Sequence, residues 1–141
     1  DAAGIKWAGW TGTFVVILAM LIAAVLFIAA PGALVGVYSQ DAKVVAAAVP
    51  TVMVAAGMVV FDGMQGVLMS ALRGAGDVWL PVIFHGIAFW GFMVPGAAIF
   101  AFSLGFGTPG LMLGAGVGVL VAAVLLTARF SVVSNRPVRR L

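Results

Sequence analysis

The sequence contains no cysteine, which excludes disulfide bonds and thiolate chemistry. Charge is scarce as well: Asp, Glu, Lys and Arg make up 8% of the 141 residues, against about 25% in a typical soluble domain. Hydrophobic residues, by contrast, make up 65% of the chain. This composition excludes a water-soluble globular domain and indicates an integral membrane protein in contact with the lipid bilayer.

Groups for catalysis and metal binding are scarce too. The single histidine, His85, has no second His, Cys or Glu with which to share a metal ion. No Ser, His and Asp stand at catalytic spacing, and no Gly-rich stretch ends in Lys followed by Ser or Thr, as a phosphate-binding loop requires. We therefore expect neither an enzyme nor a cofactor. His85 is expected to form a hydrogen bond across helices rather than to relay protons.

Long runs without charge are the main feature of the sequence. No charged residue occurs in 7–40, in 44–61 or in 78–128, and one helical crossing of a bilayer needs about 20 residues. The last run is long enough for two crossings, which divide at 103–110, where Gly and Pro cluster. We predict an all-α fold with four transmembrane helices at about 10–30, 44–72, 78–102 and 110–130, the second bent near Pro50.

Basic residues are distributed unevenly over the predicted loops. With the N-terminus inside, the outer loops hold only Lys43. The inner segments hold six basic residues: Lys6, Arg73, Arg129, Arg136, Arg139 and Arg140. Because membrane proteins keep Lys and Arg in cytoplasmic loops, we expect a multi-pass protein of the cell (inner) membrane with both ends of the chain in the cytoplasm. The net charge of +3 reflects this topology and does not indicate nucleic-acid binding.

One acid interrupts the apolar pattern of the second predicted helix. Asp62 follows the uncharged run 44–61, where hydrocarbon offers a carboxylate no counter-ion. Helical spacing places Gln65 on the same face. We therefore expect Asp62, with Gln65 beside it, to bind a proton or a metal cation during transport. The alternative is a structural acid that pairs with a polar group outside this chain or stays hydrated near the inner interface.

The stretch that ends this helix, "LRGAGD", predicts a tight inner turn. In this interpretation Arg73 complements the carboxyl end of the helix, Gly74 caps it, Gly76 belongs to the turn, and Asp77 caps the next helix. A phosphate-binding role is not expected for these residues.

Small residues and a proline mark the last two predicted helices. Pro95 removes a backbone hydrogen bond inside the third helix and is either a hinge or a static kink. Gly110, Gly114 and Gly118 recur every four residues in the fourth helix, which predicts a close-packing face.

Several of these segments resemble one family. "FDGMQGVLMSALRGAGDVWLP" is similar to the tenth helix and the following loop of multidrug and toxic compound extrusion (MATE) transporters. "VYSQDAKVV" is similar to the loop before that helix, and "FWGFMVPGAAIFAF" and "GTPGLMLGAGVGVL" resemble the last two helices. The resemblance covers nearly all 141 residues. It implies two six-helix lobes around a central cavity, of which this chain would be the last four helices, and therefore a fragment of a longer protein.

The resemblance also implies a function. Asp62 falls on a family acid implicated in coupling to Na⁺ or H⁺, with Gln65 beside it, and Asp62 would be the metal ligand if the ion is Na⁺. The expected activity is antiport that exports amphipathic organic cations, with the lipid bilayer and the remaining helices of the transporter as partners. A lipid-linked saccharide flippase is the first alternative, although such flippases commonly line their cavity with several basic residues. A structural or channel-forming protein of four helices is the second.

Overall fold

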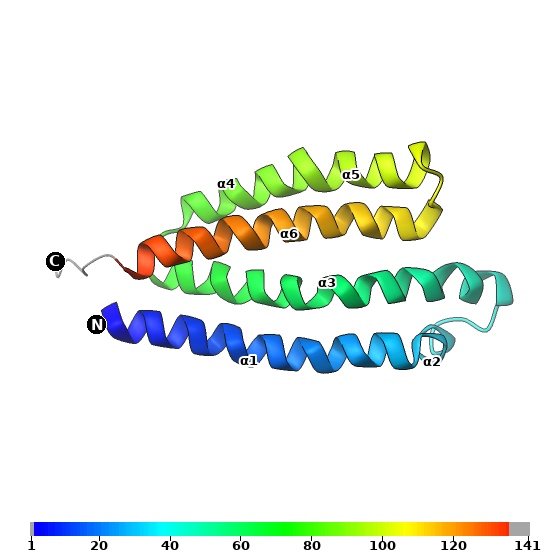
Figure 1. Cartoon of the computed structure of the whole chain (residues 1–141), viewed down its shortest axis with the longest axis horizontal. Coiled ribbons are helices and arrows are strands. Elements are labelled where there is room, and N and C mark those ends of the chain that lie inside the picture. Colours follow the sequence, from blue (N-terminus) through cyan, green and yellow to red (C-terminus); the bar gives the residue numbers. More distant parts are fainter. Residues whose placement is uncertain (1, 136–141) are drawn as a thin grey trace.

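The computed structural model describes residues 2–135, which contain helices and no strand. The helices are α1 (Ala2–Ala29), α2 (Pro31–Gly36), α3 (Ala42–Gly74), α4 (Trp79–Ile87), the π-helical η1 (Ala88–Met93), α5 (Val94–Ala98), the π-helical η2 (Ile99–Ser103) and α6 (Gly107–Ser134). Segments α4, η1, α5 and η2 run on as one long helix, which is called the third span below (Figure 1).

Within the described residues, four segments are long and apolar enough to cross a membrane: Lys6–Ala29, Ala42–Gly74, Trp79–Ser103 and Gly107–Ser134. The prediction of an all-α multi-pass membrane protein with four spans is therefore confirmed. Both ends of α3 and α6 and the start of α1 extend beyond the predicted ranges, most clearly at the start of α1, and the short helix α2 was not predicted. Arg136, Arg139 and Arg140, which were counted on the inner side, lie outside the described residues.

The spans are arranged side by side in a row. Figure 1 shows α3 between α1 and α6, and α6 between α3 and the third span. Neighbours in this row pack along their length. The order in space therefore differs from the order in the sequence, because the last helix occupies an inner position.

Aliphatic and aromatic side chains pack α1, α3 and α6 together at the end of the molecule where the described chain begins and ends. Leu68, Leu72, Leu126 and Phe130 form a buried cluster. The ring of Phe130 lies directly over Gly9 of α1, where any side chain would collide with it. This cluster fixes the spacing of three helices at that end.

The predicted glycine face of α6 packs against the third span. Gly110, Gly114 and Gly118 are buried, and a Cβ on Gly110 would lie 2.6 Å from the carbonyl oxygen of Phe100. The two backbones can approach this closely because no side chain stands between them. The prediction of a close-packing face is confirmed.

Pro95 lies between the two π-helical segments, near the start of α5. The N–H of Val94 donates to the carbonyl of Phe89, five residues earlier, as a π-helix requires. The structure thus absorbs the proline in a continuous helix with widened turns on either side. Whether Pro95 acts as a hinge stays a prediction.

The turn between α3 and α4 differs from its predicted form. Gly74 is still helical, and Gly76, with φ of 81°, takes the left-handed conformation that ends α3. The N–H of Asp77 donates to the carbonyl of Leu72 over 2.9 Å, and the N–H of Gly76 donates to that of Arg73 over 3.0 Å, which is a Schellman motif. The prediction that Gly74 caps the helix is wrong because the stop requires a positive φ, which falls two residues later. Arg73 lies in the last turn of α3, as predicted.

Candidate functional site

Asp62 and Gln65 lie one turn apart on α3 and are hydrogen-bonded to each other. The Gln65 amide nitrogen Nε2 donates to Asp62 Oδ1 over 2.8 Å. Gln65 is only 5% exposed, whereas the Asp62 side chain is exposed. The two residues therefore form one unit, in which the buried amide fixes the orientation of an accessible carboxylate.

The other end of the Gln65 amide is unsatisfied. Its oxygen Oε1 is enclosed and has no hydrogen-bond partner within the part of the chain that the structure describes. A buried acceptor without a donor costs about 1–3 kcal/mol. Such a group is expected to gain a donor or a cation when the site is occupied.

The charge of Asp62 is not balanced by a neighbouring side chain. Within residues 2–135 the ion pair found joins Arg129 to Asp77, and it does not involve Asp62. The described residues also hold no group of three or more His, Cys, Asp or Glu that could bind a metal ion. Carboxylate and amide oxygens suit hard cations. Asp62 with Gln65 could therefore supply part of a ligand set for Na⁺, or a site for one proton.

A recess opens on the same face of α3, near its N-terminal end. Its volume is about 500 Å³, and its walls include Val44, Ala47 and Thr51 of α3 and Thr108 of α6. Asp62 follows Val44 by five helical turns, so the acid and the recess share one face. This face of α3 therefore runs from the N-terminal end of the helix, which Asp41 caps, to Asp62.

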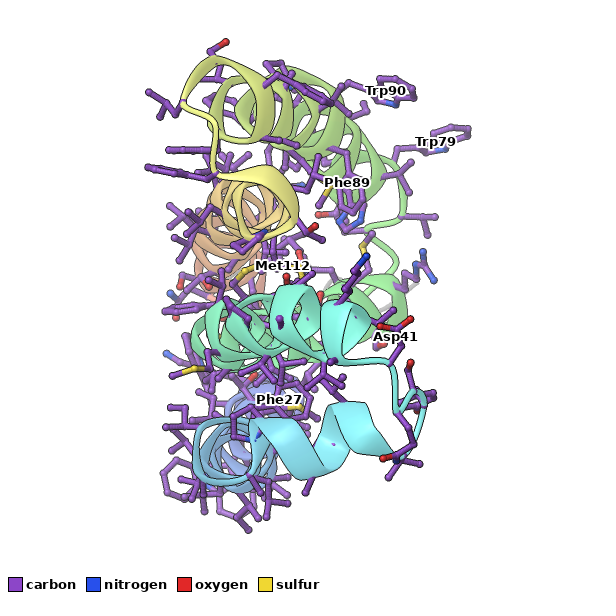
Figure 2. All side chains as sticks on the ribbon, turned by 90° about the vertical axis from the view of Figure 1, so that its right-hand side faces the viewer. Phe27, Asp41, Trp79, Phe89, Trp90 and Met112 are labelled. Atoms are coloured by element: carbon purple, nitrogen blue, oxygen red, sulfur yellow. The ribbon has the colours of Figure 1, made fainter. Side chains whose placement is uncertain are left out.

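Aromatic side chains of the third span lie together on one side of the row. Figure 2 shows Phe89, Trp79 and Trp90 on the side that also carries Asp41. Phe89 stacks on His85 with ring centroids 4.4 Å apart and an interplanar angle of 30°. The predicted cross-helix hydrogen bond of His85 is not found at Nδ1, which is enclosed without a partner in the described residues. An aromatic neighbour on its own helix packs against it instead.

Asp77 has a partner that its local sequence does not indicate. The Arg129 Nε donates to Asp77 Oδ2 over 2.6 Å, and the two side chains are 19% and 14% exposed. The predicted role of Asp77 as the cap of α4 is wrong, since Val78 holds that position and no side chain caps it. The sequence contained a signal for this pair. Asp77 and Arg129 stand at the two ends of the uncharged run 78–128, and the two ends of a helical hairpin lie on the same side of the membrane.

Comparison with known proteins identifies relatives of this chain. The family model described as MatE matches residues 4–99. A probable multidrug resistance protein NorM from Synechococcus sp. is 36% identical over 135 residues, covering 92% of this chain and 29% of the relative. Another from Xanthomonas campestris is 33% identical over 136 residues, covering 96% of this chain and 30% of the relative. No solved structure matches significantly.

The chain thus spans about three tenths of the length of the curated relatives that it matches. The family match covers more than half of the chain. This chain belongs to the MatE family.

Proposed function

We propose that this chain is the C-terminal part of a cation-coupled exporter of amphipathic organic cations, in which Asp62 takes up Na⁺ or H⁺ and releases it as the transporter changes conformation. One observation carries the proposal: an accessible carboxylate, oriented by a buried amide over 2.8 Å, stands in an otherwise uncharged stretch of a membrane helix. The relatives are named as probable multidrug resistance proteins, which supports export of several compounds.

The surroundings of Asp62 favour a cationic cargo. The spans between Val44 and Leu72 and between Val78 and Ala128 contain no Lys or Arg. A site for a lipid-linked saccharide phosphate would need basic residues, so the flippase alternative is not favoured. The proposal includes an inner-membrane location, cytoplasmic ends for this segment, and the other helices of the transporter as structural partners.

The test uses a transporter of full family length that carries this sequence. Asp62→Asn keeps the shape of the side chain and removes its charge. We expect it to abolish efflux of a fluorescent organic cation from vesicles that hold an imposed Na⁺ or H⁺ gradient, because no other described acid lies within the spans. The gradient that drives efflux by the unmodified protein identifies the ion.

A matched control is available in Asp41, the exposed cap of α3, whose Oδ1 accepts from the N–H of Lys43 over 2.8 Å. Asparagine caps a helix about as well as aspartate, so Asp41→Asn should transport normally. Gradient-driven efflux that survives in Asp62→Asn would remove this carboxylate from the coupling mechanism.

A further inference from the structure

The side of α1 that faces away from α3 carries one continuous stripe of exposed side chains. Near the start of the helix, a recess of about 560 Å³ is lined by Lys6, Trp7, Trp10, Thr11 and Phe14. Further along, a second recess of about 520 Å³ is lined by Leu18, Leu21, Ile22, Val25 and Leu26. Spacings of three, four and seven residues place both recesses on the same face of α1. The surface therefore changes from cationic and aromatic to purely aliphatic along one line.

Contacts with α6 hold the polar end of this stripe in place. The Lys6 ammonium donates to Asn135 Oδ1 over 2.8 Å. The Trp10 ring stands edge-on to Phe130, with centroids 5.6 Å apart and an interplanar angle of 71°, and Phe130 itself is fully buried. The amide of Asn135 is neutral, so it orients the ammonium group without cancelling its charge. Two of the three ammonium N–H groups remain for another acceptor.

We propose that this stripe binds one anionic phospholipid, with the phosphate on Lys6 and Thr11 and an acyl chain along the aliphatic recess. Trp7 is 75% exposed, and Trp side chains prefer the headgroup level of a bilayer, where the upper recess would lie. From Lys6 to Ile22 the helix rises by about 24 Å, which is close to half of a bilayer about 40–45 Å thick including its headgroups.

Charge complementarity favours a lipid over a protein helix as the occupant. A helix packed on the stripe would take the Lys6 ammonium out of water with only a neutral amide as its described partner. A phosphate supplies the opposite charge and leaves the headgroup hydrated. The inference does not depend on the proposed transport function or on the orientation of the chain, since this end of α1 meets headgroups on whichever side it lies.

The experiment places a photoreactive benzoylphenylalanine at Phe14, which is 61% exposed and lines the first recess at the end nearer to the second one. The full-length protein is reconstituted in vesicles of equimolar phosphatidylglycerol and phosphatidylcholine, irradiated, and its adducts are weighed by mass spectrometry. We expect lipid adducts with a preference for phosphatidylglycerol of about fivefold, the ratio that corresponds to one basic residue at an anionic surface.

Substitutions at Lys6 test whether this residue causes the preference. Lys6→Gln should bring the adduct ratio close to one, and Lys6→Arg, which keeps the charge, should retain the preference. Lys43→Gln is the matched control at the opposite end of the spans and should change nothing. Equal adducts of both lipids in the unmodified protein, an unchanged ratio in Lys6→Gln, or an adduct with polypeptide in place of lipid would each overturn the proposal.

Discussion

Replacing Gly114 with alanine should force α6 away from the third span. A Cβ at this position would lie 2.5 Å from the carbonyl carbon of Gly96 and closer still to the backbone of Ala97, whereas ordinary contact begins at 3.4 Å. The obstructing atoms belong to the backbone, so no side-chain rotation can relieve the collision. α6 and the third span therefore have to move apart until these distances reach ordinary contact. The separation also disturbs the close contacts that Gly110 and Gly118 make with the third span.

The expected loss follows from two opposing effects. Overpacking of a well-packed interior costs about 1–3 kcal/mol, and the upper end applies here because backbone atoms collide. Alanine in place of glycine within a helix stabilises the helix by up to about 1 kcal/mol. We expect Gly114→Ala to lower the free energy of unfolding by about 2 kcal/mol.

Gly66→Ala is a control with the same chemical change. The position is helical and nothing lies within 4 Å of the added Cβ, so this variant should be as stable as the unmodified protein or slightly more stable. Stability is measured as the fraction of protein that stays monodisperse in size-exclusion chromatography after heating in detergent. If Gly114→Ala survives heating as well as Gly66→Ala does, α6 and the third span do not pack through this glycine.

Two further predictions concern the turn between α3 and α4 and the topology. Asp77→Asn and Arg129→Gln should each cost about 2 kcal/mol, as expected for a hydrogen bond between charged groups that are mostly buried. The double variant should lose clearly less stability than the sum of the losses in the two single variants. Strictly additive losses of stability in the same heating assay would refute the pairing. An impermeant thiol reagent added outside the cell should label Gln40→Cys and not Asn135→Cys, both at exposed positions. Reversed labelling would place the ends of this segment outside.

The sequence predicted the spans well because hydrocarbon excludes charge, and the uncharged runs mark where the chain is surrounded by it. The same reasoning cannot find the ends of a helix. Hydrogen bonding continues into the headgroup region, so α1 already begins at Ala2 instead of about residue 10. Similarly, "LRGAGD" contains two glycines, and composition alone does not tell which of Gly74 and Gly76 adopts the left-handed conformation.

The candidate site was predictable where it depends on local geometry. Asp62 and Gln65 are three residues apart on one helix, and their hydrogen bond follows from that spacing. The burial of Gln65 and the exposure of Asp62 were not predictable, because they depend on how the neighbouring helices pack around α3. The pairing of Asp77 with Arg129, 52 residues away, has a signal in the sequence, since the two charges stand at either end of the uncharged run 78–128, but their direct contact depends on how the hairpin folds in space. The role of Asp62 in coupling stays a prediction.

The position of α6 in the row has a consequence for biosynthesis. A ribosome delivers α1, α3 and the third span to the membrane before α6 exists, yet α6 is the helix that packs on both α3 and the third span. The α1–α3 pair can form as soon as both have left the insertion machinery. The third span lacks its packing partner until α6 is inserted between it and α3. A chain that terminates before α6 would therefore leave α3 and the third span in the membrane without the helix that both of them contact.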